Sequence, residues 1–384
     1  MGATFFFRQI VMKALPNTVD HRGLDTVLDI SSRTRIPVLV LGSPGMGKST
    51  HIKDYALKNN LEFIDIRLST HDITDLTGLP RFSDNRAQFI PFDIFPLEDT
   101  PLPEGKKGFL VLLDELTSCR RDMQVAAYRL LLDREVGQYK LHPKCVVVAA
   151  GNRITDGAVV NEMSSALKSR LITVHLEFDM HNWLYDYAVN QGLDRDVIAF
   201  AAFKGSRLFT STDLSDLDEC DSITVPRTME FVSRIVSAIK ESGEEVSQVH
   251  LPLISGTIAH NDAIELIKFM EYKSSIPAYE EAIADPTSVI INSSPKQYYA
   301  AVNYYSHVDC KALAALEEPE WERLVSLNIL LSTFDQSIQI LFWRMLVKDN
   351  PGLLVPVINR PELSNVKSIF ASIREMSYGF SKAD

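Results

Sequence analysis

Residues 42–49 of this chain read GSPGMGKS, and they fit the phosphate-binding pattern G-x-x-x-x-G-K-[ST]. An apolar run at residues 37–41, PVLVL, stands directly before this stretch and predicts a buried strand. The residues that follow, at about 48–58, predict a helix. Because backbone N–H groups of a glycine-rich turn between a strand and a helix can close around phosphate oxygens, this order predicts a nucleotide-binding α/β fold.

The phosphate-loop pattern assigns a role to its positions. Lys48 is expected to reach the β- and γ-phosphates, and the Ser49 hydroxyl is expected to take part in binding Mg²⁺. Glycines lack the Cβ atoms that would keep a phosphate away, and the helix N-terminus favours an anion. The alternative is a glycine-rich turn without a ligand, which the flanking strand and helix argue against. The residues predicted to contact the nucleotide are Gly42, Ser43, Pro44, Gly45, Met46, Gly47, Lys48, Ser49 and Thr50.

Composition and charge narrow the class of protein. The chain has 384 residues, of which 46% are hydrophobic, enough for two or three domains with a sizeable core. The net charge of −11 argues against a broad nucleic-acid-binding surface, because such surfaces usually carry a basic excess. The four cysteines form no C-x-x-C pair, so the sequence predicts neither a zinc site nor a disulfide framework.

The usual patterns for membrane insertion and export give no match. Residues 1–16 include a short apolar patch, but no small-residue cleavage site follows it, and position 6 lacks the Ser or Thr of a myristoylation signal. No stretch reaches about 18 consecutive apolar residues. We therefore expect a soluble, cytoplasmic protein that has no membrane partner.

From about residue 20 to residue 178, short apolar runs alternate with helical patterns. This alternation is typical of a parallel sheet with helices on both faces. Helices are predicted at about 21–32, 48–58, 121–132 and 161–169. Strands are predicted at residues 37–41, 62–66, 109–113, 145–150 and 172–177. The sequence therefore predicts an α/β domain with a five-stranded parallel sheet between helices.

Two stretches depart from this alternation. Residues 69–108 are rich in proline, and their centre, RAQFIPFDIF, predicts extended or hairpin structure. A long segment of this kind inside a compact domain is either functional or assigned to the wrong elements, and we favour a functional segment. After residue 178 helical patterns replace the strands, with a loop rich in Ser, Thr and Asp at 205–225. Helices are predicted at about 180–191, 194–203, 226–241, 261–270, 277–284, 296–305, 318–347 (as two helices) and 361–376.

A pair of carboxylates follows the predicted strand 109–113. Asp114 stands where this strand would end, and a carboxylate there can bind Mg²⁺ directly or through water. Glu115 comes next and is placed to polarise the water that attacks the γ-phosphate. The alternative is an acidic pair that caps the next helix. With a phosphate loop present, we expect the nucleotide to be hydrolysed.

Three more polar residues are candidates for the same site. Asn152 follows the strand 145–150, and it would lie beside the γ-phosphate and orient water if that strand lies between the strands 37–41 and 109–113. Arg170 ends a predicted helix, where it either reaches the γ-phosphate of a neighbouring subunit or meets the dipole of its own helix. Arg227 opens a helix behind a proline, and it either folds a lid over the nucleotide or is a surface arginine.

In this order, these five elements resemble the AAA+ ATPases, and within them the MoxR-like branch. The resemblance is closest over about residues 34–240 and includes GSPGMGKS, RLSTHDITDLTGLP, LLDELTSCRRDMQVAAYRLLLDREVGQYKL, VVVAAGNRITDGAVVNEMSSALKSRL and VPRTMEFVSRI. It implies an AAA+ P-loop domain, then an all-helical lid and a helical C-terminal region. The implied divisions are an N-terminal helical segment 1–33, an ATPase core 34–178 with an insert at about 70–105, a lid 179–245 and the C-terminal region 246–384.

The resemblance implies a role for each motif. Lys48 and Ser49 match the Walker A motif, and Asp114 and Glu115 match the Walker B motif. Leu171 departs from the phenylalanine that usually follows the finger arginine, and we expect this apolar exchange of similar volume to be tolerated. The implied cofactors are ATP and Mg²⁺, with Ser49 and Asp114 on the metal ion. Asn152 matches sensor 1, Arg170 matches the arginine finger, and Arg227 matches sensor 2, which makes Glu115, Asn152 and Arg170 the implied catalytic residues.

The resemblance also implies an assembly and a function. The family forms rings, usually hexamers, with ATP at the subunit interfaces, and its members act as chaperone-like remodelling ATPases. Many of them work with a partner that contains a von Willebrand factor A domain. In this branch a hairpin-bearing insert precedes the Walker B strand, and residues 70–105 occupy that place. This insert and a short turn at 134–140 are expected to line the central pore.

The sequence therefore predicts a ring-forming ATPase that remodels, activates or matures a protein partner. One alternative is a DNA-directed AAA+ motor or loader, against which the net charge of −11 argues. Another is a scaffold that binds ATP without turnover, against which Asp114 and Glu115 argue. The helices beyond about residue 250 are expected either to support the lid or to dock a partner.

Overall fold

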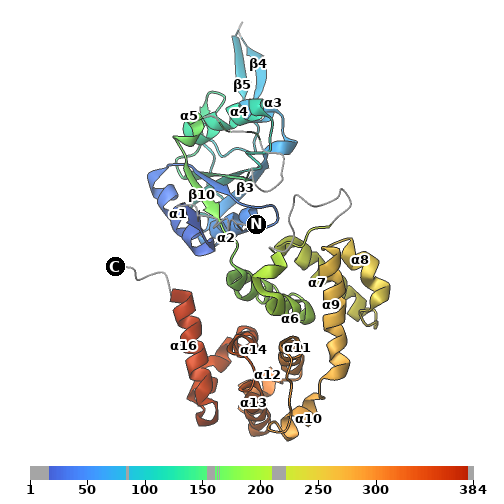
Figure 1. Cartoon of the computed structure of the whole chain (residues 1–384). Helices are drawn as coiled ribbons and strands as arrows, with labels where there is room; N and C mark the ends of the chain where they lie inside the picture. Colours follow the sequence, from blue (N-terminus) through green and yellow to red (C-terminus); the bar gives the residue numbers. More distant parts are fainter. Residues whose placement is uncertain are drawn as a thin grey trace, which may run out of the picture. The chain divides into compact units, whose positions relative to one another are not determined.

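The computed structural model describes residues 17–83, 86–153, 161, 163, 165–209 and 222–378 (Figure 1). The chain divides into two compact units, and the division falls between Asp179 and Met180. The first unit holds a parallel sheet flanked by helices, and the second unit is helical. Within the described residues, no helix is both long enough and apolar enough to cross a membrane.

The sheet of the first unit confirms the predicted parallel α/β fold and adds one strand. The five predicted strands are all present, and a sixth, β1, pairs in parallel with β10 at one edge. β1 is only two residues long, so it leaves no periodic pattern in the sequence. The strands, in spatial order, are β1 (Thr18–Val19), β10 (Ile172–Leu176), β2 (Val38–Leu41), β9 (Cys145–Gly151), β6 (Gly108–Asp114) and β3 (Leu61–Arg67).

The strand order decides which loops meet. β9 lies between β2 and β6 and pairs in parallel with both, as the prediction for Asn152 required. Because parallel strands end at the same edge of a sheet, the loops after β2, β6 and β9 lie side by side. This edge therefore collects the phosphate loop, the Asp114–Glu115 pair and Asn152.

Two apolar layers hold the sheet between its helices. Every residue of β6 is buried, which explains why it reads as one continuous apolar run. Phe109, Val111 and Leu113 point to one face of the sheet, and Leu110 and Leu112 point to the other. The first face packs against α4 (Arg121–Leu132), and the second face packs against α1 (His21–Thr34) and α2 (Lys48–Lys58).

The predicted insert contains a short helix as well as the expected hairpin. β4 (Leu79–Ser83) and β5 (Arg86–Ile90) pair in antiparallel fashion, and they form the hairpin at one end of the first unit in Figure 1. The helix α3 (Ile73–Thr77) precedes them and was not predicted from the sequence. The Asp75 side chain accepts a hydrogen bond from the Asp72 N–H at 3.0 Å, which fixes the start of this short helix.

The predicted turn at 134–140 is a second small hairpin, formed by β7 (Glu135–Val136) and β8 (Tyr139–Lys140).

Most of the predicted helices are present, with three corrections. Residues 180–191 do not form an ordinary α-helix, because Asn182–Ala188 is π-helical. The predicted helix 161–169 is a single turn, α5 (Ser165–Lys168), which belongs to the first unit. Three short helices were missed because five or six residues give no clear period: α8 (Leu251–Ser255), α12 (Cys310–Ala314) and α15 (Leu354–Asn359).

The longer helices of the second unit follow their predicted ranges. The stretch predicted as two helices, 318–347, is indeed broken in the middle, between α13 and α14. The helices are α6 (Arg195–Lys204), α7 (Pro226–Glu241), α9 (His260–Met270), α10 (Tyr279–Ala284), α11 (Ser294–Tyr305), α13 (Glu318–Leu331), α14 (Gln336–Asp349) and α16 (Ser364–Tyr378).

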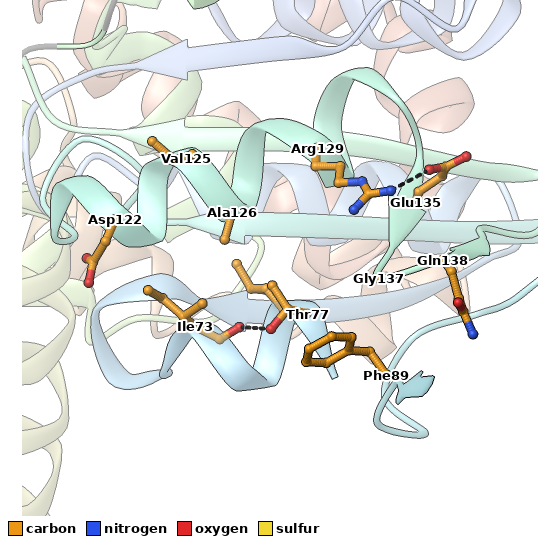
Figure 2. A pocket seen from close by; sticks show the side chains of 11 residues that line it. Ile73, Thr77, Phe89, Asp122, Val125, Ala126, Arg129, Glu135, Gly137 and Gln138 are labelled. Atoms are coloured by element: carbon orange, nitrogen blue, oxygen red, sulfur yellow. Dashed lines mark hydrogen bonds and ion pairs between the residues drawn. The ribbon is translucent and has the colours of Figure 1, made fainter. Parts of the chain in front are cut away.

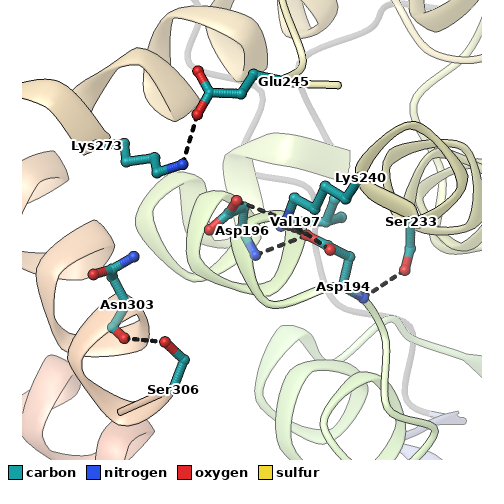
Figure 3. A network of polar contacts seen from close by, with 9 residues as sticks. All are labelled: Asp194, Asp196, Val197, Ser233, Lys240, Glu245, Lys273, Asn303 and Ser306. Atoms are coloured by element: carbon teal, nitrogen blue, oxygen red, sulfur yellow. Dashed lines mark hydrogen bonds and ion pairs between the residues drawn. The ribbon is translucent and has the colours of Figure 1, made fainter. Parts of the chain in front are cut away.

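A charged network joins α6 to α7 in the second unit (Figure 3). Lys240 Nζ lies 2.8 Å from Asp194 Oδ2 and 2.7 Å from Asp196 Oδ2. Asp194 caps α6 and also accepts a hydrogen bond from the Asp196 N–H. Burial raises the pKa of Asp196, and Lys240 opposes this shift without cancelling it. The network therefore places one cation against two largely buried carboxylates.

Candidate nucleotide-binding site

The phosphate loop lies between β2 and α2, as the motif requires. Gly45 and Gly47 have φ angles of 77° and 83°, which belong to the left-handed region that favours glycine. An ideal Cβ at Gly47 would meet no atom within 4 Å, so the backbone conformation, and not crowding, requires glycine there. The loop begins at Gly42, whose N–H donates to the Gly151 carbonyl at 3.2 Å, which ties the loop to the end of β9.

The Lys48 ammonium group is held at the centre of this edge. Lys48 is only 7% exposed. Its Nζ donates to the carbonyls of Gly42 at 2.6 Å and Ser43 at 3.0 Å, and to Asn152 Oδ1 at 3.1 Å. A buried ammonium is stable only with such partners. The lysine therefore stands between the phosphate loop and Asn152, where it can meet an anion.

The two predicted metal ligands touch each other. Ser49 Oγ donates to Asp114 Oδ2 at 2.6 Å, and Asp114 is 8% exposed. Hydroxyl and carboxylate oxygens are the ligands that Mg²⁺ prefers, so these residues fit a magnesium–nucleotide complex. On the neighbouring strand β3, burial and then the charge of Asp114 raise the pKa of Asp65.

Glu115 has an unusual backbone and two side-chain partners. Its φ of 60° is in the left-handed region, which non-glycine residues rarely adopt. Ser69 Oγ donates to Glu115 Oε2, and Arg67 Nε lies 3.7 Å from Glu115 Oε1. Sequence reasoning gave Ser69 and Arg67 no role, although both lie in the stretch RLSTHDITDLTGLP that carries part of the resemblance. Their position at the carboxyl end of a strand that pairs with β6 was a further signal.

Asn152 lies where the sequence placed it. It follows β9 directly, and its side chain contacts Lys48 across 104 positions of the sequence. The hydroxyl of Thr117, from the turn after β6, accepts a hydrogen bond from the Asn152 N–H at 2.8 Å and donates to the Asn152 carbonyl at 3.1 Å. Thr117 was not among the predicted site residues.

The two predicted arginines are placed differently from the rest. Arg170 is exposed and follows α5 by two residues, so it lies in a turn and not at the helix end. Arg227 is exposed in the first turn of α7, one residue after Pro226, and belongs to the second unit. The fold of the first unit therefore brings together Lys48, Ser49, Asp114, Glu115 and Asn152.

A separate cavity of about 880 Å³ lies on the first unit, between α3, α4 and the two hairpins (Figure 2). Its lining is mostly apolar and includes Ile73, Phe89 and Val125. Val125 is 64% exposed although it stands on a packed helix. Arg129 and Glu135 form an ion pair at 3.2 Å along its rim.

Comparisons with known proteins find a family match within the first unit. Residues 37–171 match the family model of the AAA domain, dynein-related subfamily. No curated protein matches the sequence. Among solved structures, one from Cytophaga hutchinsonii, described as a "putative ATPase", is 13% identical, with 92% of this chain and 90% of that chain covered and a TM-score of 0.34. A variant of RuvB from Thermotoga maritima is 14% identical, with 70% and 78% covered and a TM-score of 0.34.

The family match and the geometry both indicate nucleotide binding at the edge of the sheet where the loops after β2, β6 and β9 meet. The matched residues contain the phosphate loop, the Asp114–Glu115 pair and Asn152, which the fold brings together. Residues 37–171 therefore match an AAA domain, and this match supports an ATP-hydrolysing enzyme.

Proposed function

We propose that this chain is a MoxR-like AAA+ ATPase that forms a ring, hydrolyses ATP between neighbouring copies, and remodels, activates or matures a protein partner. The observation that carries the proposal is the contrast between its site residues. Lys48 contacts Asn152 and Ser49 contacts Asp114 within one copy, whereas Arg170 is exposed. An exposed guanidinium is available to a second copy.

Each residue of the cluster then has a task. Lys48 holds the β- and γ-phosphates, and Glu115 accepts a proton from the attacking water while Asn152 orients that water. Mg²⁺, held by Ser49 and Asp114, would offset the charge of the phosphate oxygens. Arg170 of a neighbouring copy stabilises the charge that develops in the transition state, an effect of about 10³–10⁵ in rate for arginines of this kind. Arg227 would report on the nucleotide from the second unit.

The cavity on the first unit supports a role in binding protein partners. Monomeric proteins rarely leave large apolar surfaces open, and such surfaces often mark interaction sites. The apolar lining of this cavity includes Ile73 from α3 and Phe89 from the insert hairpin, and Phe82 in the same hairpin is 81% exposed. We propose that the insert contacts the client here and that the partner chain contains a von Willebrand factor A domain.

Mixed assemblies test whether hydrolysis occurs between copies. Lys48→Ala removes the phosphate contact, and Arg170→Ala removes the proposed finger. Each variant alone should be at least about 10³-fold slower than wild type. An assembly that contains both variants should regain turnover, because some interfaces combine an intact Lys48 with an intact Arg170 from the next copy. No recovery at any mixing ratio would contradict hydrolysis in trans.

Glu115→Gln separates turnover from binding. The amide cannot accept the proton, so we expect hydrolysis to fall by about 10²–10⁴ while ATP still binds. The trapped complex should then retain its client in a pull-down, compared with Lys48→Ala as the control that binds no ATP. Unchanged turnover in Glu115→Gln would remove Glu115 from its proposed role.

A further inference from the structure

The side-chain hydroxyl of Thr117 makes hydrogen bonds to both main-chain groups of Asn152, its N–H and its carbonyl. Thr117 is 2% exposed and lies in the turn after β6, two residues beyond Glu115. Its hydroxyl accepts from the Asn152 N–H at 2.8 Å and donates to the Asn152 carbonyl at 3.1 Å. Both backbone groups of Asn152 are therefore held by one side chain. The Asn152 carboxamide, in turn, contacts Lys48 Nζ at 3.1 Å.

The packing around this contact leaves little freedom. A Cβ on Gly151 would lie 2.5 Å from Thr117 Oγ1 and 2.7 Å from Thr117 Cγ2, so the threonine rests directly on the Gly151 backbone. One residue earlier, the Leu116 N–H donates to the Ala150 carbonyl at 2.9 Å. The turn after β6 and the end of β9 are thus fastened at successive residues, beyond the paired part of the two strands.

The same turn also holds the chain beyond Asn152. The Thr117 carbonyl accepts from the Asn161 N–H at 2.7 Å, and Asn161 Nδ2 donates to the Cys119 carbonyl at 2.8 Å. Asn161 precedes α5, which leads to Arg170. The turn that carries Glu115 is therefore bonded both to Asn152 and to the segment before the exposed arginine.

We propose that Thr117 is a positioning residue for ATP hydrolysis, which acts by fixing the direction of Asn152 relative to Lys48 and Glu115. This inference rests on the role proposed above for Asn152. Thr117 is two residues from Glu115 and bonded to Asn152, so it fixes the spacing of the two groups assigned to the attacking water. A misplacement of about 1 Å in such a group can lower a rate by about 10²-fold.

Substitutions at Thr117 test the proposal by separating the rate from binding. Thr117→Val keeps the shape but loses both hydrogen bonds, and we expect kcat to fall by about tenfold or more with the Kd for ADP within about twofold of wild type. Thr117→Ser keeps the hydroxyl and should restore most of the lost turnover. A purely structural role would lower the unfolding midpoint and affect binding and turnover together.

A double variant shows whether Thr117 acts through Asn152. If it does, Thr117→Val combined with Asn152→Ala should be no slower than Asn152→Ala alone, because coupled groups are not additive. If the two losses multiply, Thr117 acts in another way and the proposal is wrong. If Thr117→Val does not fold, Thr117→Ala can replace it in the double variant. Alanine also lacks the hydroxyl, and it does not place a methyl group in the position that the hydroxyl occupied.

The two hypotheses fail differently. Wild-type kcat in Thr117→Val, alongside a slow Asn152→Ala, would overturn the positioning role and leave the proposed function intact. Wild-type kcat in Asn152→Ala itself would overturn the role of Asn152 in the proposed function. Equal losses in Thr117→Ser and Thr117→Val would also contradict the proposal, because the hydroxyl would then not be the active group.

Discussion

The hydroxyl of Ser69 donates a hydrogen bond to the carboxylate of Glu115, from a residue 46 positions away in the sequence. Ser69 lies in the 3₁₀ turn η1 (Leu68–Thr70), between β3 and α3. Arg67 Nε stands 3.7 Å from the other oxygen of the same carboxylate. Both oxygens of the proposed base are therefore engaged by residues at and just beyond the end of β3.

Removing the Ser69 hydroxyl should raise basal ATP hydrolysis. A hydrogen bond to a charged group contributes about 1.5–3 kcal/mol, so freeing the Glu115 oxygen by Ser69→Ala should increase kcat, by about tenfold or more. Steady-state ATPase rates measure this, and Ser69→Thr, which keeps a hydroxyl, is the matched control. A fall in kcat for Ser69→Ala would show instead that Ser69 orients Glu115 for catalysis.

A methyl group on Gly151 should disturb both stability and turnover. An ideal Cβ there lies 2.5 Å from Thr117 Oγ1, so Gly151→Ala must push Thr117 away from Asn152. Overpacking of this kind costs about 1–3 kcal/mol, and we expect a lower unfolding midpoint together with reduced kcat. Gly352→Ala is the control, because a Cβ at Gly352 meets no atom within 4 Å. If Gly151→Ala and Gly352→Ala had the same unfolding midpoint and the same kcat, a Cβ at Gly151 would not crowd Thr117 as expected.

His21 should make the stability of the first unit depend on pH. It begins α1, and its ring meets that of His51 at 4.9 Å between centroids. Burial, and then the charge of His51, lower the pKa of His21 from 6.5 to about 4. The folded state thus favours the neutral ring, so its contribution is fully present above pH 6.5 and is lost as the pH falls towards 4.

Urea unfolding at several pH values tests this dependence. Between pH 8 and pH 5, the titration of His21 should remove about 2 kcal/mol from the free energy of unfolding. His21→Asn cannot titrate, so its free energy of unfolding should fall less than that of wild type over the same interval. Parallel pH profiles for the two proteins would exclude His21 as the source.

The charged network of the second unit should depend on Lys240. Lys240→Met leaves the carboxylates of Asp194 and Asp196 together without their cation, and their side chains are 10% and 16% exposed. Removing one partner of a buried ion pair costs about 3–5 kcal/mol, and we expect about 2–3 kcal/mol because Lys240 itself is partly exposed. Lys273→Met, which breaks an ion pair between two exposed groups, is the control and should change unfolding little.

The sequence alone determined the phosphate loop, the parallel α/β core and the acidic pair after β6. Each of these rests on a local pattern: an apolar run, a glycine-rich turn, or a carboxylate at the end of a buried strand. The same reasoning placed the long helices, because ten or more residues are enough to show a helical period. It missed β1 and the helix α3, which are two and five residues long and show no period of their own.

Only the tertiary structure decided which of these groups meet. The contact between Lys48 and Asn152 exists because β9 lies between β2 and β6, an order that no local pattern specifies. Ser69 and Thr117 lie in stretches that the resemblance covers, but their partners become evident only because neighbouring strands end at the same edge of the sheet. Local patterns reflect the preferences of adjacent residues, whereas a site is formed by residues that strand order brings together from distant parts of the chain.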